Sequence, residues 1–287
     1  MRKHFIYFLA ALSIGFSSCT KDDLENLDPI SAKIMLNENY GTDPKQTMDI
    51  YLPANRNAAN TKVMVLIHGG GWSGGDKADM SVVVDSLKKR MPDYAFFNIN
   101  YRLASWPANL FPTQEIDVKA AVAFIHGNSN YYQVSKKFVF AGASAGGHLA
   151  LLQGFKDSVP VKAKAIVSFF GPSDMVDMYN NPASPAAPAA AVAALMSGTP
   201  TSNPNLYFSS SPINYINSSS APTILIQGGL DPLVRASQST NVQTKLTAAG
   251  VANQLVFYPT GGHGDWDVAT YTDAFNKIQA FLTANVQ

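Results

Sequence analysis

The chain has 287 residues, of which 46% are hydrophobic and 14% are charged. These proportions fit a globular protein with one large core, and they exclude a disordered chain. The formal net charge of +1 predicts no basic surface for nucleic acid, and the single cysteine excludes an internal disulfide.

The first residues have the pattern of a secretory signal. A basic start precedes an apolar run over 5–16, which is too short to span a bilayer, and two serines then lead to Cys19. This ending resembles the lipobox of bacterial lipoproteins, although Phe16 stands where leucine is usual. The resemblance implies that residues 1–18 are removed and that Cys19 is lipidated, which would hold an exported protein at the outer membrane or cell surface. The alternative is an ordinary signal peptide that ends near a cysteine.

An acidic, polar tether is predicted over 19–31, and beyond it short β-branched or aromatic runs alternate with helical patterns. Strands are predicted at 32–37, 47–52, 62–67, 95–101, 137–142, 163–170, 222–227 and 253–258. Helices are predicted at 79–90, 115–127, 146–154, 235–249 and 268–285. This alternation predicts an α/β domain over 32–287, with a mostly parallel sheet of about eight strands and helices on both faces.

One stretch interrupts the alternation. Residues 176–220 are rich in Ala, Pro, Ser and Asn, and strand-like sequence resumes after them. A small helical insertion that forms a cap over the active site is the favoured interpretation, and a loose linker is the alternative. Because much of it is Ala and Pro, we expect this cap to offer little apolar wall, so that short esters are preferred over long-chain lipids.

Residues 142–146 read Gly-Ala-Ser-Ala-Gly, between a predicted strand and a predicted helix. In that setting the G-x-S-x-G pattern predicts a nucleophile elbow, a strained turn that lifts the hydroxyl of Ser144 above the sheet. Glycines are expected on both sides because side chains there would collide with neighbouring elements. The helix that starts beside Ser144 would direct N–H groups at developing negative charge.

A second glycine-rich stretch, His-Gly-Gly-Gly-Trp at 68–72, follows the predicted strand 62–67. Three glycines let the backbone approach a substrate and aim amides at an oxyanion. A simple glycine-rich turn is the alternative. A phosphate-binding loop is disfavoured because its Gly-Lys-Ser/Thr ending is missing.

The general base is sought among five histidines. His4 lies in the signal, His68 belongs to the glycine loop and is expected to brace it, and His126 ends a helix. His148 is expected to pack on the helix after the elbow. His263 remains, on a glycine-rich loop after the last predicted strand, from which its ring can reach the nucleophile.

The acid that orients this histidine is predicted to be Asp231, which follows the strand at 222–227. The order Ser144, Asp231, His263 is the order expected for a nucleophile elbow of this type. Asp174, which also follows a strand, is the second candidate. The acids that come after His263 fit this order poorly.

Together these motifs resemble the esterase and lipase branch of the α/β-hydrolases, over residues 45–284. The resemblance implies that the backbone amides of Gly70, Gly71 and Ala145 form an oxyanion hole, and that Trp72 supports the loop or lines the substrate pocket. Further matching stretches are Asp49–Pro53, Asn100–Leu103 and Gly146–Ala150.

The resemblance has one departure. Hormone-sensitive-lipase-like members carry an acidic residue before the nucleophile, where this chain has Ala143. The match therefore moves toward carbohydrate esterases similar to acetyl-xylan and feruloyl esterases, although kynurenine-formamidase-like enzymes share the loop. It implies a serine esterase that acts through an acyl-enzyme on short-chain, acetyl or feruloyl carbohydrate esters.

Two other functions remain open. One is a peptidase of the same fold, similar to the prolyl-oligopeptidase group, and the other is a non-catalytic, lipid-anchored binding protein. The sequence has no cluster of His, Cys and acids at ligand spacing, so it predicts no metal site and no organic cofactor. The expected partners are a small-molecule or carbohydrate ester and, through Cys19, a membrane.

Overall fold

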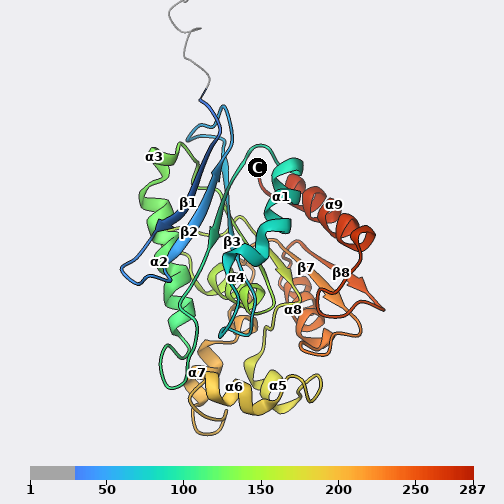
Figure 1. Ribbon diagram of the computed structural model, residues 1–287. Helices are drawn as coiled ribbons and strands as arrows, with labels where there is room; N and C mark the ends of the chain where they lie inside the picture. The colour runs from blue at the N-terminus through green and yellow to red at the C-terminus, as the bar shows by residue number, and fades with distance from the viewer. Residues whose placement is uncertain (1–29) are drawn as a thin grey trace, which may run out of the picture.

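The computed structural model describes residues 30–287, so the predicted signal peptide, Cys19 and most of the predicted tether lie outside the described part. Eight strands form one sheet in the order β1-β2-β4-β3-β5-β6-β7-β8 (Figure 1). β2 is antiparallel to β1 and β4, and every pair from β4 to β8 is parallel. The predicted mostly parallel sheet of about eight strands is confirmed.

The strands are β1 Lys33–Asn39, β2 Thr47–Leu52, β3 Lys62–Ile67, β4 Tyr94–Ile99, β5 Phe138–Ala143, β6 Ala165–Phe169, β7 Thr223–Gly228 and β8 Asn253–Tyr258. The helices that cover the sheet are α1 Ser81–Arg90, α2 Thr113–Gly127, α3 Ser129–Tyr132, α4 Ala145–Lys156, α8 Ala236–Ala248 and α9 Val268–Asn285, with a short 3-10 helix at Lys77–Met80. All eight predicted strands and all five predicted helices are present, and their ends differ from the prediction by one or two residues at most.

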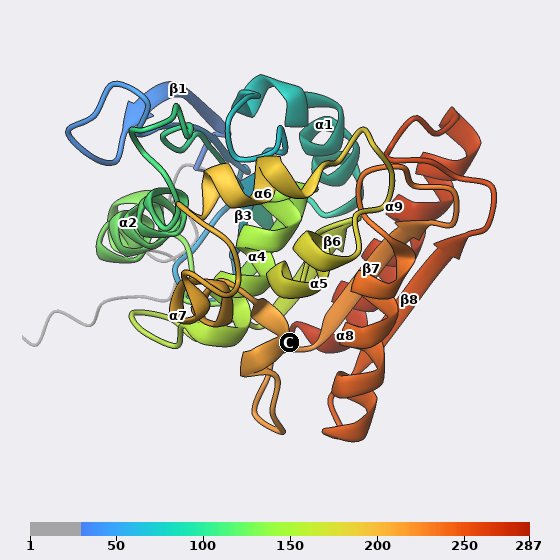
Figure 2. The ribbon, with the colours of Figure 1, turned by 90° about the horizontal axis from the view of Figure 1, so that it is seen from below.

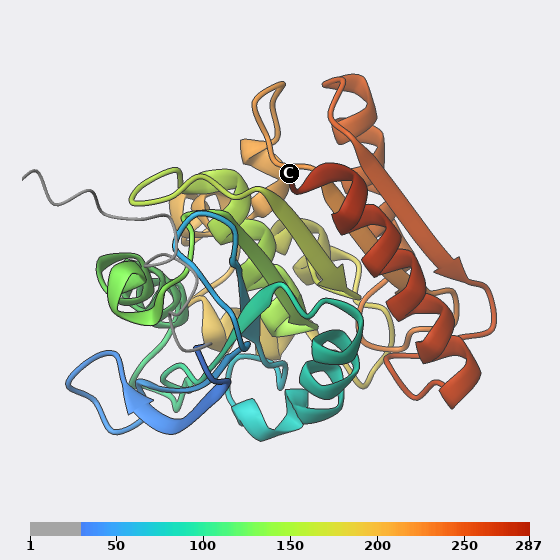
Figure 3. The same ribbon diagram turned by 90° about the horizontal axis from the view of Figure 1, so that it is seen from above.

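Helices cover both faces of the sheet, and the strand sequences show why. Along β3, Val63, Val65 and Ile67 point into one core layer, where they pack with α2, α4 and α8. Met64 and Leu66 alternate with them and point into the other layer, beneath α1 and α9. Figure 3 shows α1 and α9 together on one side of the sheet. A strand that is buried on both faces reads as a continuous apolar run, as the central strands of this chain do.

The segment between β6 and β7 forms an insertion of short helices: α5 Met175–Asn180, α6 Ala189–Leu195, α7 Pro204–Ser209 and a 3-10 turn at Pro212–Tyr215. These helices lie together at the carboxyl ends of the parallel strands, and Figure 2 shows α6 in front of α4. We refer to this segment, residues 175–215, as the insertion.

The two ends of the described chain lie at the opposite end of the molecule from the insertion (Figure 1). β1 runs in the same direction as the parallel strands, so Lys33 lies at their amino ends. At the other terminus, Gln287 lines a surface hollow together with Lys62, the first residue of β3. Within residues 30–287, no helix combines the length and hydrophobicity needed to cross a bilayer.

Candidate active site

Ser144 stands on the sharp turn between β5 and α4. Its backbone has φ +55° and ψ −120°, a region that few residues other than glycine adopt. The turn is held by its own backbone, because the N–H of Ser144 donates to the carbonyl of Phe169 (2.8 Å) and its carbonyl accepts from the N–H of His148 (3.0 Å). The strained turn predicted for the nucleophile elbow is present.

The glycines around this turn are required by close backbone contacts. A Cβ at Gly142 would collide with the carbonyl of Gly146, on the first turn of α4. A Cβ at Gly146 would collide with the carbonyls of Ile67 and His68. The elbow is therefore packed directly against the start of the glycine loop, which follows β3.

Ser144, His263 and Asp231 meet in one hydrogen-bonded chain. The Nε2 atom of His263 lies 2.9 Å from the Oγ of Ser144. Its Nδ1 atom lies 2.7 Å from Oδ2 of Asp231, whose side chain is completely buried, whereas the histidine side chain is 15% exposed. The structure thus brings together the three residues that the sequence suggested, from loops after β5, β7 and β8.

Hydrogen-bond donors to both oxygens hold the carboxylate of Asp231 in place. Its Oδ1 accepts the N–H groups of Leu233 and Val234, each at 2.8 Å. Its Oδ2 lies 3.3 Å from Nε2 of Gln227, and Gln227 is itself fixed because its Oε1 accepts the hydroxyl of Ser239 (2.8 Å). Sequence reasoning did not single out Gln227. Its position at the end of β7, four residues before the acid, was the available signal.

Asp174, the second candidate for the acid, has another role. Its side chain accepts the N–H groups of Val176 and Asp177, both at 3.0 Å, and so caps the first turn of α5. The Nδ1 atom of His263 pairs with Asp231 instead.

The ring of His263 rests on Phe170, with 4.5 Å between ring centroids and a tilt of 53°. Phe170 has φ +40°, an unusual value for a bulky residue. Gly264, the residue after His263, has φ +83°, and a Cβ there would come within 2.8 Å of the same Phe170 ring. This packing restricts the histidine to the orientation that faces Ser144.

The glycine loop presents free amides next to the elbow. Gly70 and Gly71 have φ of +103° and +59°, and the carbonyl of Gly70 accepts the N–H groups of Ser73 and Gly74. Among residues 30–287, no hydrogen bond uses the N–H of Gly70, Gly71 or Ala145. Donors without a protein partner at this position are available to a ligand.

His68 braces the loop from below, as expected. Its ring stacks on Tyr101 with centroids 4.3 Å apart, and its Nδ1 lies 2.7 Å from the carbonyl of Gly69. Burial lowers the pKa of His68, which favours the neutral imidazole.

Trp72 and His148 join the glycine loop to the rest of the site. The indole N–H of Trp72 donates to Nδ1 of His148 (3.2 Å), so the proton of the neutral imidazole lies on Nε2 and donates to the carbonyl of Ser210 (2.7 Å). Burial lowers the pKa of His148 to about 4. The histidine therefore packs, as predicted, and it also connects the loop, helix α4 and the insertion.

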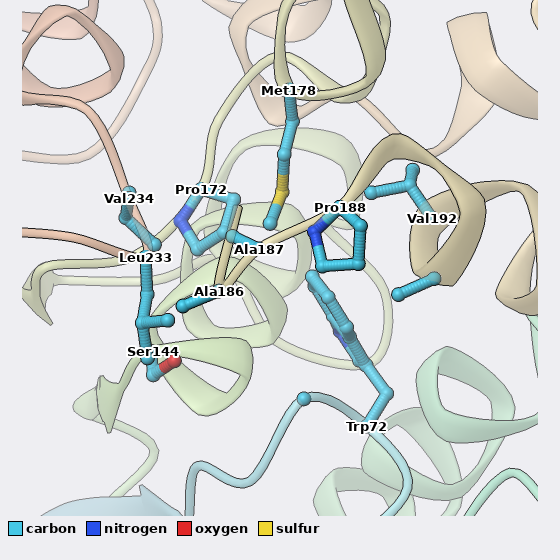
Figure 4. Close-up of a pocket in the computed structure, with 12 residues that line it drawn as sticks. Trp72, Ser144, Pro172, Met178, Ala186, Ala187, Pro188, Val192, Leu233 and Val234 are labelled. Atoms are coloured by element: carbon cyan, nitrogen blue, oxygen red, sulfur yellow. The ribbon is translucent and has the colours of Figure 1, made fainter. Parts of the chain in front are cut away.

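A cavity of about 210 Å³ opens beside Ser144, and we call it the Ser144 cavity. Gly71 and Trp72 line it from the glycine loop, and Leu233 and Val234 line it from the loop after β7. Met178 and Val192 of the insertion point into the same space (Figure 4), and the other lining residues are Pro172, Ala186, Ala187, Pro188 and Ala191.

The expectation that the insertion offers little apolar wall is wrong. The side chains of its alanines and prolines are apolar, and Met178 and Val192 add larger apolar side chains. Sequence reasoning missed these two residues, and also Leu233 and Val234, because no local pattern marks a side chain that meets Ser144 only through the fold. Among the described residues, no group of three or more His, Cys, Asp or Glu is placed to hold a metal ion.

Residues 48–246 match the family described as BD-FAE, over well more than half of the chain. The chain belongs to the BD-FAE family. The matched range contains the glycine loop, Ser144 and Asp231, and it ends before His263. The position of His263 beside Ser144 comes from the structure alone.

Curated relatives of this BD-FAE protein carry esterase or ester-hydrolase names. One is "Esterase LipC" of Mycobacterium tuberculosis, 26% identical over 78% of this chain and 58% of its own length. Another is "Isoprenylcysteine alpha-carbonyl methylesterase ICME" of Arabidopsis thaliana, 25% identical over 79% of this chain and 55% of its own length. The chain spans about half the length of the curated relatives it matches.

Solved structures show the same fold. The "Bifunctional GH43-CE" of Bacteroides eggerthii superposes with a TM-score of 0.74 at 28% identity, over 88% of this chain and 38% of that chain. A truncated "carbohydrate esterase from gut microbiota" gives a TM-score of 0.74 at 25% identity, over 90% of this chain and 99% of that chain. An esterase of Thermogutta terrifontis, at 19% identity, gives 0.70 over 88% of this chain and 94% of that chain, a likeness in fold alone. The α/β-hydrolase fold predicted from the sequence is confirmed.

Proposed function

We propose that this BD-FAE protein is a serine esterase that hydrolyses carboxylic esters through an acyl-enzyme. The observation that carries the proposal is the chain of contacts from Ser144 Oγ through His263 to the buried carboxylate of Asp231, at 2.9 and 2.7 Å. These distances lie within the reach needed for proton transfer between a nucleophile and its base. The esterase names of the homologous relatives support the same reaction.

The contacts define the role of each group. The Nδ1–H of His263 donates a hydrogen bond to Asp231, which leaves the lone pair of Nε2 facing Ser144. As the Ser144 oxygen attacks the ester carbonyl, Nε2 takes its proton, and the imidazolium then gives that proton to the departing alcohol. Water, activated by the same histidine, cleaves the acyl-enzyme and restores the serine.

The negative charge that develops on the carbonyl oxygen requires donors. The free N–H groups of Gly70, Gly71 and Ala145 are proposed to supply them, since none is used elsewhere among residues 30–287. Ala145 is the first residue of α4, so its amide also lies at the positive end of that helix. Trp72 is proposed to bind substrate from the wall of the Ser144 cavity.

The proposed substrates are short-chain, acetyl or feruloyl esters of carbohydrates. The Ser144 cavity of about 210 Å³ is smaller than the roughly 300–1,000 Å³ of pockets for drug-sized ligands, which favours a small acyl group. The structural neighbour at 25% identity is named a carbohydrate esterase, which supports a sugar as the alcohol.

The test combines a probe with a substrate panel. A fluorophosphonate should label the wild type, and Ser144→Ala should lose labelling together with turnover of aryl acetates by several powers of ten. Ser86→Ala, on α1, is the matched control and should behave like wild type. Labelling that persists in Ser144→Ala would refute the nucleophile. Cleavage of peptides in preference to esters would favour the peptidase, and absence of labelling in the wild type would favour a binding protein.

We also propose that Cys19 carries a lipid that anchors the exported protein at the outer membrane or cell surface. The pattern of the first 19 residues supports this proposal. A multiply acylated cysteine would hold firmly, whereas one acyl chain gives marginal binding. The wild type should partition into detergent with the membranes, and Cys19→Ser should be released or remain unprocessed. Wild-type protein found free in the periplasm or medium would refute the anchor and leave the esterase proposal unaffected.

A further inference from the structure

A second hollow lies next to the Ser144 cavity, and we call it the Trp106 hollow. It measures about 230 Å³ and shares Gly71 and Ala191 with the Ser144 cavity. Its other lining residues are Ser73, Ala104, Trp106, Leu110, Ala194 and Leu195. The two spaces therefore meet where the glycine loop approaches helix α6.

Helix α6 lies between the two spaces, and its residues line both of them. Its sequence is Ala-Ala-Ala-Val-Ala-Ala-Leu, so it places no long polar side chain between them. Val192 contributes to the Ser144 cavity, Ala194 and Leu195 contribute to the Trp106 hollow, and Ala191 contributes to both. Gly71 and Ala191 line both spaces, and the side chain that α6 places at this shared boundary is a methyl group.

Trp106 is 74% exposed, although the turn that carries it is held by hydrogen bonds at both ends. At one end the N–H of Ala104 donates to the carbonyl of Trp72 (2.9 Å), and at the other the N–H of Phe111 donates to the carbonyl of Leu195 (3.2 Å). Paired bonds between Ser105 and Ala108 close the turn. The turn is thus bound to the glycine loop and to α6, the two elements that form both spaces.

The Trp106 hollow is lined by both apolar and polar groups. The broad faces of Trp106 and the alanines of α6 are apolar, whereas the hydroxyl of Ser73 is polar and exposed. An indole has an apolar face and a polar N–H edge, so an exposed indole suits a ligand that has one apolar face and one hydrated face. A pyranose ring has this character, because its C–H groups form an apolar face and its hydroxyls form a polar rim.

We propose that the Trp106 hollow binds the sugar ring on the alcohol side of the ester, with the ring stacked on Trp106, while the acyl group occupies the Ser144 cavity. The assignment rests on the proposed esterase function. It follows from the residues that line each space: Ser144 lines only the first, so the acyl group that becomes bound to it lies there, whereas the hollow of similar volume beside an exposed indole leaves room for a longer glycan to continue into solvent.

The first experiment compares three esters. An acetylated xylo-oligosaccharide tests the sugar, ethyl acetate tests the same acyl group with a small alcohol, and ethyl ferulate tests an aromatic acyl group. Trp106→Ala should raise KM for the sugar ester about tenfold with little change in kcat, while kcat/KM for the two ethyl esters stays within about twofold. Trp106→Phe should restore most of the loss, and Tyr131→Ala, another exposed aromatic on α3, should match wild type.

Two results would overturn the assignment. An unchanged KM for the sugar ester in Trp106→Ala would remove the subsite. A loss confined to ethyl ferulate would place the acyl group, and not the sugar, in the Trp106 hollow.

A binding measurement separates this proposal from the esterase proposal. Ser144→Ala should bind the acetylated xylo-oligosaccharide in calorimetry, and adding Trp106→Ala should weaken binding about tenfold. Binding that depends on Trp106 in a wild type without esterase activity would refute the esterase and support a sugar site. Wild-type hydrolysis of ethyl acetate, with no binding by Ser144→Ala or no effect of Trp106, would refute the sugar site alone.

Discussion

Replacing Asp231 by asparagine tests the geometry of the site most directly. The carboxylate accepts four donors: the N–H groups of Leu233 and Val234 on Oδ1, and Gln227 and His263 on Oδ2. An asparagine oxygen would keep the two backbone bonds. Its NH₂ group would then face two donors, and His263 would have to turn its Nδ1 into an acceptor and move its proton to Nε2.

In that tautomer His263 directs a proton at Ser144 and cannot receive one. We therefore expect kcat to fall about 10⁴-fold, which corresponds to about 5.5 kcal/mol in the activation free energy. The fold should survive, because the side chain keeps its size and its backbone bonds.

The assay is kcat and KM for an aryl acetate, with urea unfolding as a check on the fold. Asp174→Asn is the matched control, since asparagine caps a helix as well as aspartate and should leave both activity and stability near wild type. A loss below about tenfold in Asp231→Asn, or a larger loss in Asp174→Asn, would refute the assignment of the acid.

Three further predictions follow from the same contacts. Gly146→Ala should lower the free energy of unfolding by about 1–3 kcal/mol and reduce activity, because its Cβ would collide with backbone atoms before the glycine loop, including the Ile67 carbonyl carbon at 2.6 Å. A variant that unfolds in urea and turns over substrate like the wild type would contradict this prediction. The pKa of His148 is lowered to about 4 in the folded protein, so between pH 4 and about 6.5 this histidine binds fewer protons when folded than when unfolded. The free energy of unfolding should therefore fall by about 3 kcal/mol from pH 6.5 to pH 4. Urea unfolding across this range should show the loss, and His148→Gln should show less of it. The Ser144 cavity predicts higher kcat/KM for acetyl than for decanoyl aryl esters, measured below their aggregation limits, and the reverse order would show that longer chains are accommodated.

The sequence predicted those parts of the site that carry local signals. Ser144 was found because a G-x-S-x-G pattern stood between a strand and a helix, and the structure shows the steric reason for its glycines. Asp231 and His263 were found because each follows a strand in the order expected after such an elbow, and they lie within hydrogen-bond distance of each other. The strands themselves were predicted well because each is a short apolar run with clear breaks.

Contacts between distant parts of the chain left no such signal. His148 was expected to pack, but nothing near it in sequence shows that Trp72 and Ser210 are its partners. The insertion gave only composition, and composition does not tell which faces of α5 and α6 turn toward Ser144. The prediction about its wall failed for that reason: alanine and proline, which suggest a weak wall when counted, form an apolar one when they face inward together with Met178.

The position of the two ends of the described residues has a consequence for where such a domain can be attached to a support or to another module. Lys33 and Gln287 lie at the amino ends of the strands, at the far end of the molecule from Ser144 and the insertion. A module or a support coupled near Lys33 or Gln287 would lie away from the Ser144 cavity. Attachment at this end of the fold would therefore leave the opening beside Ser144 unobstructed.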